Sequence, residues 1–323
     1  MTERRALQVA AFVMGALAVP YSQAAAVGVY PEKPVRLIVP SPPGGGNDIM
    51  ARLAGQKLTE AWGKQVVVDN RPGAGGAIAF ETAARAEPNG YTLLLGSTNF
   101  TVLPDMTKVN YDAIKDFVAV SLLATSMNIL LVHPAVPAKS TKELIAFAKA
   151  NPGKLNYGTA IATSVHLAAE LFKAKAGVNI VLVPYKGMGP ALLDLVAGNV
   201  DVAFANPAAA HPHVESGRMR ALAVTGAKRS AMLPSVPTIA EAAIPGFEAS
   251  TWWGILAPAG TPRAIVSEVN SKLARAFAQR DMTERVAALG AEPAGGEPKR
   301  LAEHLNSEIP KWREVIRAAN IRL

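Results

Sequence analysis

Two glycine-rich segments carry the clearest binding chemistry in this chain of 323 residues. The first, "PPGGGND" at residues 42–48, follows the apolar run "VRLIV", and the second, "NRPGAGG" at residues 70–76, follows "QVVVD". Each precedes a helix-length segment, so backbone N–H groups can converge there with the positive end of a helix dipole. The pair predicts a site where main-chain groups hold one small anion, such as a carboxylate.

Neither segment matches the phosphate-binding loop of a nucleotide-binding protein. A P-loop needs Gly-Lys-Ser/Thr after four intervening residues, and a dinucleotide fingerprint needs Gly-x-Gly-x-x-Gly. Ile49 stands directly after the first segment, and neither pattern is completed. We expect Asp48 to cap the helix that follows. Arg71 is either a counter-ion for the anion or a side chain that points to solvent.

A third polar group lies in "NYGTAIATSVHLAAE" at residues 156–170. Thr159, Thr163 and Ser164 stand before a helix, where hydroxyls either cap the helix or donate to a ligand across a cleft. His166 and Glu170 are spaced i, i+4, but two ligands are too few for a metal site. We therefore predict no metal and no cofactor.

The sequence offers little for catalysis. It has no cysteine, no Gly-x-Ser-x-Gly elbow and no His-Glu-x-x-His motif. We therefore predict a binding protein rather than an enzyme. Two alternatives stay open: an exported enzyme that acts on a small carboxylate through Ser164 and His166, and an interaction protein that senses a ligand for a membrane sensor.

The elements that must position these residues form two α/β lobes. Short apolar strands alternate with helix-length amphipathic segments from residue 35 and again from residue 140, which predicts two parallel sheets covered by helices. The segment after "STWWGILAP" is expected to be an all-helical tail that covers the first lobe. With chain crossings near residues 124–130 and 245–253, lobe 1 comprises residues 27–127 plus 246–323, and lobe 2 comprises residues 128–245.

The first 26 residues read as a signal peptide that is cleaved on export to the periplasm. Arg4 and Arg5 precede an apolar run of about fifteen residues, and small residues follow at Ser22, Ala24 and Ala26. The net charge of +8 comes from lysines and arginines interleaved with acidic residues. That scattered pattern does not favour nucleic acid as a partner, and we expect a monomer.

Several motifs, in order along nearly the whole chain, resemble the Bug family, the extracytoplasmic solute receptors of tripartite tricarboxylate transporters. They are "YPEKPVRLIVPSPPGGGNDIMARLAGQKL", "VVVDNRPGAGGAIAFETAARAEPNGYTLLLGS", "STKELIAFAKANPGKLNYG", "VPYKGMGPALLDLVAGNVDVAFAN", "ALAVTGAKRSAMLPSVPTIAEA" and "GILAPAGTP". The resemblance implies a type II-like, two-lobed periplasmic binding protein fold that closes on a small organic acid, a mono- or dicarboxylate. It also implies a membrane partner, either the membrane subunits of a tripartite transporter or the ectodomain of a sensor kinase.

Carried over by position, the resemblance places ligand-binding residues in both lobes. The first lobe would contribute Ser41, Pro43, Gly44, Gly45, Asn47, Gly73, Ala74, Gly75, Gly76 and Thr98, and the second Thr159, Ser164, His166 and Asn206. Two departures change the pocket. Ser41 replaces an aromatic residue common in the family, and Ala160, Ile161 and Ala162 replace a flexible part of the second-lobe loop, which is one residue shorter. The sequence does not name the ligand.

Overall fold

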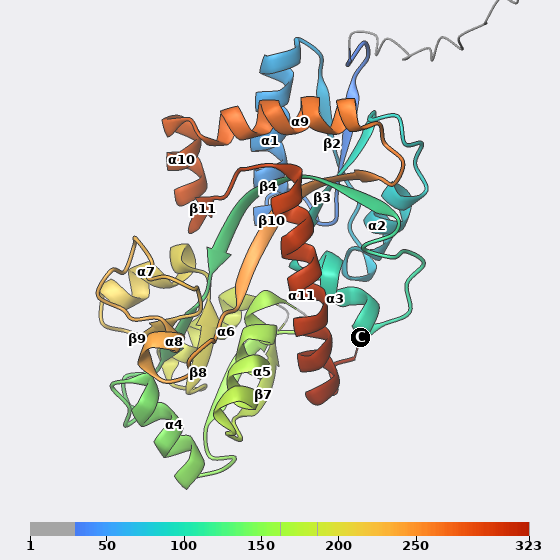
Figure 1. Cartoon of the computed structure of the whole chain (residues 1–323). Helices are drawn as coiled ribbons and strands as arrows, with labels where there is room; N and C mark the ends of the chain where they lie inside the picture. The colour runs from blue at the N-terminus through green and yellow to red at the C-terminus, as the bar shows by residue number, and fades with distance from the viewer. Residues whose placement is uncertain (1–29, 162, 186, 323) are drawn as a thin grey trace, which may run out of the picture. The chain divides into compact units, whose positions relative to one another are not determined.

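The computed structural model describes residues 30–161, 163–185 and 187–322, which are drawn in colour in Figure 1. The predicted signal peptide, residues 1–26, lies outside the described residues. Strands and helices mostly alternate from residue 35 to residue 318, and the strands form two separate sheets. The chain therefore has the predicted α/β class with two sheets.

The first sheet has six strands in the order β11-β4-β10-β3-β1-β2. Their bounds are β1 Val35–Val39, β2 Val66–Asn70, β3 Thr92–Ser97, β4 Phe117–Met127, β10 Ser250–Pro258 and β11 Ala291–Pro293. Strands β1, β2 and β3 are parallel, but β10 runs antiparallel to both β3 and β4. The expected parallel sheet is thus mixed, because β10 enters from the other sheet in the opposite direction.

The second sheet has five strands in the order β7-β6-β8-β5-β9. Their bounds are β5 Ile129–Val132, β6 Asn156–Ala160, β7 Val181–Tyr185, β8 Val202–Ala205 and β9 Arg220–Val224. Strand β6 is parallel to β7 and β8, whereas β5 is antiparallel to β8 and β9. This sheet is also mixed, again because a strand that arrives from the other sheet, here β5, runs against its neighbours.

The chain passes between the sheets at two places. Asn128 separates β4 from β5, and Ala249 precedes β10, so both crossings fall inside the predicted ranges. At the crossing, Ser250 pairs with Met127, which places β4 and β10 side by side, as Figure 1 shows. The residue limits proposed for the two lobes stay a prediction.

Helical segments follow the parallel strands of both sheets. Helix α1 (Gly46–Trp62) follows β1, η1 (Ala74–Gly76) and α2 (Ala77–Ala84) follow β2, α3 (Thr98–Met106) follows β3, and α5 (Ser164–Ala176) follows β6. The remaining helices are α4 Thr141–Ala150, α6 Met188–Ala197, α7 Pro207–Glu215, α8 Ile239–Ala242, α9 Arg263–Phe277, α10 Arg280–Ala287 and α11 Pro298–Ala318. Helix α3 was not among the predicted helices, because Pro104 interrupts its apolar run.

The C-terminal tail differs from its prediction in two respects. It is not all-helical, because β11 pairs antiparallel with β4 at the edge of the first sheet. It also covers more than the first lobe. Leu301 of α11 packs in a cluster with Trp252 of β10, whereas Trp312, further along the same helix, packs in a cluster with Leu167 of α5. Helix α11 therefore lies against elements of both sheets.

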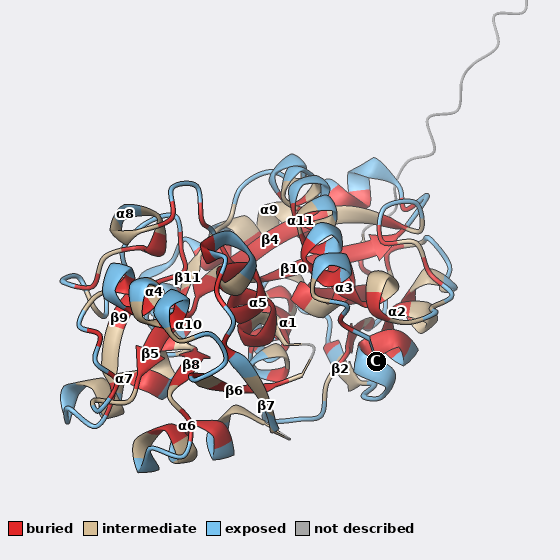
Figure 2. Ribbon diagram, turned by 90° about the horizontal axis from the view of Figure 1, so that it is seen from below, coloured by how far each residue is buried: buried red, intermediate tan, exposed pale blue. Residues whose placement is uncertain are grey.

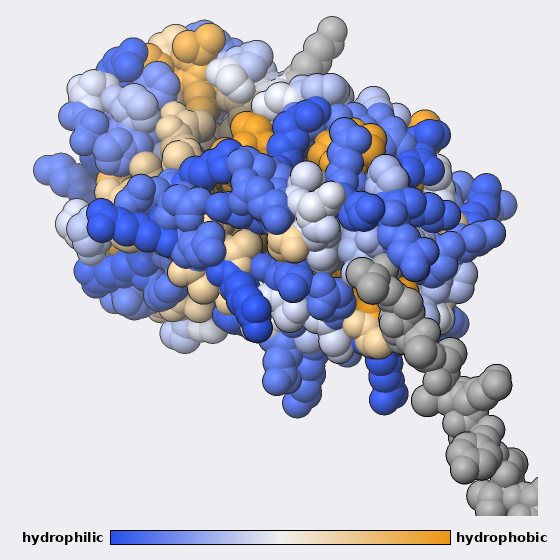
Figure 3. Space-filling model, turned by 90° about the horizontal axis from the view of Figure 1, so that it is seen from above, coloured by the Kyte–Doolittle hydropathy of each residue, from blue (hydrophilic) through white to orange (hydrophobic). Residues whose placement is uncertain are grey.

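Apolar burial holds these elements together. The strands of both sheets are largely buried, and the helices expose their outer faces, as Figure 2 shows. The face seen in Figure 3 is mostly hydrophilic, with hydrophobic residues in small groups. Burial of apolar surface is the dominant favourable term in folding. None of the helices in the described part of the chain has the length and apolar composition needed to cross a membrane.

Candidate functional site

A cavity of about 470 Å³ lies where the segments that follow β1, β2, β3 and β6 meet. It is lined by Asn47, Gly75, Ser97, Thr98, Asn99, Ile161, Thr163, Ser164 and Thr251. Except for Thr251 of β10, these residues lie at or just beyond the carboxyl ends of parallel strands, where open α/β sheets bind ligands. Segments that follow strands of both sheets therefore line one cavity.

Three helix N-termini meet at the cavity. Helix α1 begins at Gly46, α3 at Thr98 and α5 at Ser164. The first N–H groups of a helix have no partner inside the helix, and the helix dipole makes this end partly positive. None of the described lining residues carries a charge. The wall therefore offers hydrogen-bond donors and partial positive charge, which suits an anion.

Thr98 brings an unpartnered hydroxyl to this wall. It is 4% exposed, and its buried Oγ1 has no hydrogen-bond partner among the described residues. A buried hydroxyl without a partner costs free energy, and this one belongs to a residue of the cavity wall. Thr98 is one of the predicted site residues.

Four consecutive residues of the second glycine segment, 73–76, have positive φ angles. The φ angles are 120° at Gly73, 47° at Ala74, 66° at Gly75 and 108° at Gly76. A Cβ atom on Gly76 would lie 2.8 Å from Asn99 Nδ2 and 2.8 Å from the Phe80 ring, so glycine is required there. Of these four predicted residues, Gly75 lines the cavity.

Asn99 holds this segment in place. Its Nδ2 donates to the carbonyl oxygen of Gly75 at 2.8 Å, and its Oδ1 accepts from Ser97 Oγ at 2.5 Å. Both ends of the Asn99 amide are thus engaged by the protein. The side chain fixes the position of Gly75 at the edge of the cavity.

The first glycine segment is held by Asp48, although not as a helix cap. The N-cap of α1 is Gly45, and Asp48 lies in the first turn, 3% exposed. Its carboxylate accepts hydrogen bonds from the Gly44 N–H at 2.9 Å, Arg52 Nε at 3.0 Å and Asn70 Nδ2 at 3.0 Å. Burial acts to raise the pKa of Asp48, but these hydrogen bonds outweigh it and lower the pKa below its usual value.

The predicted residues of this segment divide into two groups. Asn47 lines the cavity, whereas Ser41, Pro43, Gly44 and Gly45 are not among its lining residues. Whether these four reach a bound ligand stays a prediction.

The second-lobe residues are placed by the start of α5. Thr163 is the N-cap: its Oγ1 accepts from the His166 N–H at 3.4 Å and donates to the Ala160 carbonyl at 2.6 Å. Ser164 lines the cavity, but Thr159 and His166 are buried and do not line it. Burial lowers the pKa of His166, and the nearby Glu170 carboxylate opposes this shift.

Asn206 is engaged away from the cavity. It is the N-cap of α7, where its Oδ1 accepts from the Ala208 N–H at 2.9 Å. Its Nδ2 donates to Ser126 Oγ at 3.1 Å, and that hydroxyl donates to the Gly290 carbonyl at 2.5 Å. Asn206 therefore joins the second lobe to β4 and the tail, and a role in ligand binding stays a prediction.

Sequence reasoning missed three lining residues. Ser97 and Asn99 flank Thr98 in the polar run "STN" after β3, a signal of the same kind as those after β1 and β2. Thr251 lies in the crossing strand β10, and nothing in its sequence neighbourhood marks it.

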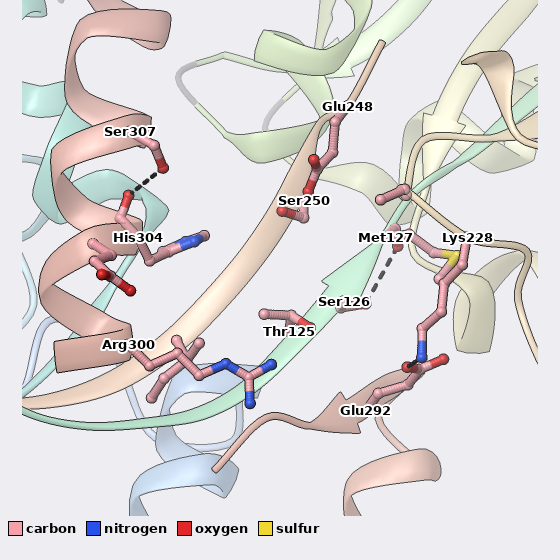
Figure 4. A pocket seen from close by; sticks show the side chains of 14 residues that line it. Thr125, Ser126, Met127, Lys228, Glu248, Ser250, Glu292, Arg300, His304 and Ser307 are labelled. Carbon is pink, nitrogen blue, oxygen red and sulfur yellow. Dashed lines mark hydrogen bonds and ion pairs between the residues drawn. The ribbon is translucent and has the colours of Figure 1, made fainter. Parts of the chain in front are cut away.

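A second cavity, of about 530 Å³, lies on the other side of β10. Ser250 lines it, and Thr251 lines the first cavity; neighbouring residues of a strand face opposite sides. Figure 4 shows its charged lining, in which Lys228 pairs with Glu292 at 2.6 Å. Arg300 donates to the backbone carbonyls of Ala294 and Gly295.

The charges of the second cavity disfavour an anion. Lys228 is paired with Glu292, and Arg300 is bound to backbone carbonyls. The lining contains three carboxylates, those of Glu248, Glu292 and Glu303. The first cavity has no carboxylate among its described lining residues. We therefore take the first cavity as the candidate site.

In the described residues, no group of three or more His, Cys, Asp or Glu side chains is placed to hold a metal ion.

Comparison with known proteins identifies the family of this chain. The family model of the tripartite tricarboxylate transporter family receptor matches residues 50–321. Protein BugT of Bordetella pertussis is 38% identical over 298 residues, which cover 91% of each chain. This confirms the resemblance to the Bug family.

Two solved structures carry bound acids. Rpa4515 of R. palustris with adipate is 38% identical, with a TM-score of 0.77, and the match covers 91% of this chain and 99% of that one. MatC (Rpa3494) of Rhodopseudomonas palustris with bound malate is 32% identical, with a TM-score of 0.74 and coverage of 89% and 100%. The match over nearly the whole length shows that this chain belongs to the tripartite tricarboxylate transporter receptor family.

Proposed function

We propose that the protein is a periplasmic receptor that captures a small mono- or dicarboxylate in the first cavity and delivers it to the membrane subunits of a tripartite transporter. The observation that carries this proposal is the uncharged, donor-rich wall in which α1, α3 and α5 begin. Such a wall neutralises a carboxylate with backbone N–H groups and helix dipoles rather than with a counter-ion. Relatives that bind adipate and malate support the ligand class.

Binding is coupled to lobe closure in this proposal. Asn47, Gly75 and Thr98 belong to the first lobe, and Ile161 and Ser164 belong to the second. A ligand that contacts both walls has a higher affinity for the arrangement in which they approach each other, and it shifts the population by that difference in affinity. The membrane subunits would then recognise the loaded receptor.

Thermal unfolding against a panel of acids tests the ligand class. Acetate, succinate, malate, adipate and benzoate are each added to protein purified after expression of the full chain. A ligand at about 100 times its Kd that binds the folded state alone adds about 2.7 kcal/mol of stability. A shift confined to one chemical type of acid supports the receptor function, and a flat panel with ligand-free protein contradicts it.

Thr98→Val connects a response to this cavity. The substitution removes a buried hydroxyl that has no partner, so the free energy of unfolding without ligand stays the same or rises. The acid-induced shift should fall. Thr101→Val in the same helix is the matched control, because Thr101 Oγ1 donates to the Thr98 carbonyl and does not line the cavity. This control should lose stability and keep the full response.

Uptake tests delivery. Cells that lack this chain should lose uptake of the acid that stabilises the protein, and re-expression of the chain should restore it. Unchanged uptake in the deletion strain would contradict the transport part of the proposal while leaving binding intact.

A further inference from the structure

We propose that Trp253 is a positioning residue that makes the cavity selective for an ionised carboxylate over a neutral amide, by fixing the orientation of the Asn47 side chain. This inference rests on the proposed function and adds the group that sets the donor character of the first-lobe wall. Trp253 does not line the cavity and acts through Asn47.

The two residues come from distant parts of the chain. Trp253 lies on β10 and pairs with Ser97 of β3, one residue before Thr98 in the cavity wall. Its indole Nε1 donates to Asn47 Oδ1 at 2.7 Å, and the side chain is 6% exposed. A Cβ atom on Gly46 would lie 3.6 Å from Trp253 Cζ2, so the first turn of α1 lies directly against the indole.

The indole determines which end of the Asn47 amide faces the ligand. An indole N–H donates a hydrogen bond and cannot accept one, whereas a carboxamide has an acceptor oxygen and a donor NH₂ group. With Oδ1 held by Trp253, the NH₂ group is left for the cavity, and it makes no hydrogen bond to another described residue. Asn99, the other lining amide, has both ends engaged by Ser97 and Gly75.

Selectivity follows from this orientation. An NH₂ group pointing into the cavity donates more strongly to an ionised carboxylate oxygen than to the neutral carbonyl oxygen of an amide, and it cannot accept from the NH₂ group of an amide ligand. Without the indole N–H, the Asn47 amide can rotate by half a turn and present its oxygen. An oxygen there repels a carboxylate and accepts from an amide, so discrimination between the two would be lost.

Trp253→Phe is the test, because phenylalanine keeps an aromatic ring beside Gly46 and removes the N–H donor. Isothermal titration calorimetry measures the Kd of the panel acid that binds the wild type most tightly, and of the same molecule with each carboxylate replaced by a primary amide. We expect W253F to weaken acid binding by roughly tenfold or more, the value of one hydrogen bond to a charged group. The ratio of the acid affinity to the amide affinity should fall by a similar factor.

Trp252→Phe is the matched control. Trp252 neighbours Trp253 on β10 but lies in the apolar cluster that contains Leu301, and its indole N–H has no partner among the described residues. This variant removes an indole from the same strand without touching Asn47. The acid Kd and the acid-to-amide ratio should stay at wild-type values.

A double-mutant cycle with Asn47→Ala separates positioning from a general packing effect. If Trp253 acts through Asn47, W253F has no further effect on acid binding in the N47A background. Equal losses in both backgrounds, or an unchanged acid-to-amide ratio in W253F, would overturn the inference while leaving the receptor function in place. If no acid binds the wild type, the proposed function itself fails, and this inference fails with it.

Discussion

The hydroxyl of Thr225 accepts a hydrogen bond from the backbone N–H of Asn128 at 2.8 Å. The same hydroxyl donates to the carbonyl oxygen of Ala249 at 2.5 Å. The backbone of Thr225 bonds to the same two residues, through its N–H to Asn128 and through its carbonyl to Ala249. Asn128 and Ala249 are the points where the chain crosses between the sheets, so one buried threonine joins both crossings.

Thr225→Val should destabilise the protein by about 1–3 kcal/mol, because valine has nearly the same shape and leaves the buried Asn128 N–H without its partner. Urea unfolding measures the loss. Thr82→Val is the matched control, since Thr82 is only half-buried and donates to the Ile78 carbonyl of its own helix in a hydrogen bond exposed to solvent. The control should change stability by less than about 0.5 kcal/mol. Equal losses in the free energy of unfolding of the two variants would contradict the role of the Thr225 hydroxyl in stabilising the two crossings.

Gly76→Ala should destabilise the fold and weaken ligand binding together. A φ of 108° is unfavourable for alanine, and the added Cβ would meet Asn99 and Phe80. We expect a loss of at least about 2 kcal/mol from backbone strain and overpacking. Displacing Asn99 would also release Gly75 from its place at the cavity.

Gly45→Ala provides the comparison for Gly76. Its φ is −83°, and a Cβ there would meet no atom within 4 Å. Thermal unfolding without ligand should therefore match the wild type. A stable Gly76→Ala protein with normal ligand affinity would contradict the role assigned to the second glycine segment.

Asp48 makes stability depend on acid pH. Its pKa is lower in the folded protein than in the unfolded chain, where a carboxyl titrates near about 4. The folded state therefore binds fewer protons, and this stabilisation is full above that pH and falls as the pH drops through the folded-state pKa. Asp48→Asn should cost about 1–3 kcal/mol at pH 7.

Urea unfolding of wild type and Asp48→Asn at pH 7 and at about pH 3 checks this prediction. The difference in the free energy of unfolding should shrink at the lower pH, where the wild-type carboxyl gains its proton. A difference that does not change with pH would mean that the charge of Asp48 contributes nothing and that the loss comes from replacing one of its two acceptor oxygens by an NH₂ group.

Much of the fold could be predicted because local patterns specify it. The strand at residues 35–39 and the strand at residues 250–258 have the predicted bounds, since each is a short apolar run between turn-forming residues. Strand β11 and the bounds of α11 could not be predicted. A three-residue strand ending at Pro293 has no periodicity, and its pairing with β4 is a tertiary contact. Pro310 lies inside α11, and a proline normally indicates the end or the start of a helix, so the sequence does not indicate one continuous helix there.

The candidate site was predictable to the extent that glycine segments mark helix starts. Asn47 and Gly75 follow from that signal, and both line the cavity. The role of Trp253 does not, because the sequence separates it from Asn47 by most of the chain and a hydrogen bond between them depends on the order of strands in the first sheet. The position of Thr251 in the cavity wall also depends on the order of strands, so the sequence does not predict it. Contacts made by the crossing strands need the structure.

Trp312 of α11 ties the tail to elements of the second lobe. It is almost fully buried in the cluster that contains Leu167 and Phe172 of α5, and its indole Nε1 donates to Glu308 Oε2 at 2.6 Å. Trp312→Ala should therefore lower the free energy of unfolding by about 3–5 kcal/mol, from the lost burial and the cavity that it leaves. Trp62→Ala is the comparison: this half-buried indole donates to Glu268 at 3.1 Å and contributes less buried area. Urea unfolding should show a clearly smaller loss for Trp62→Ala. Comparable losses would mean that α11 stabilises the protein no more than a peripheral helix does, and that its contact with α5 does not join the two lobes.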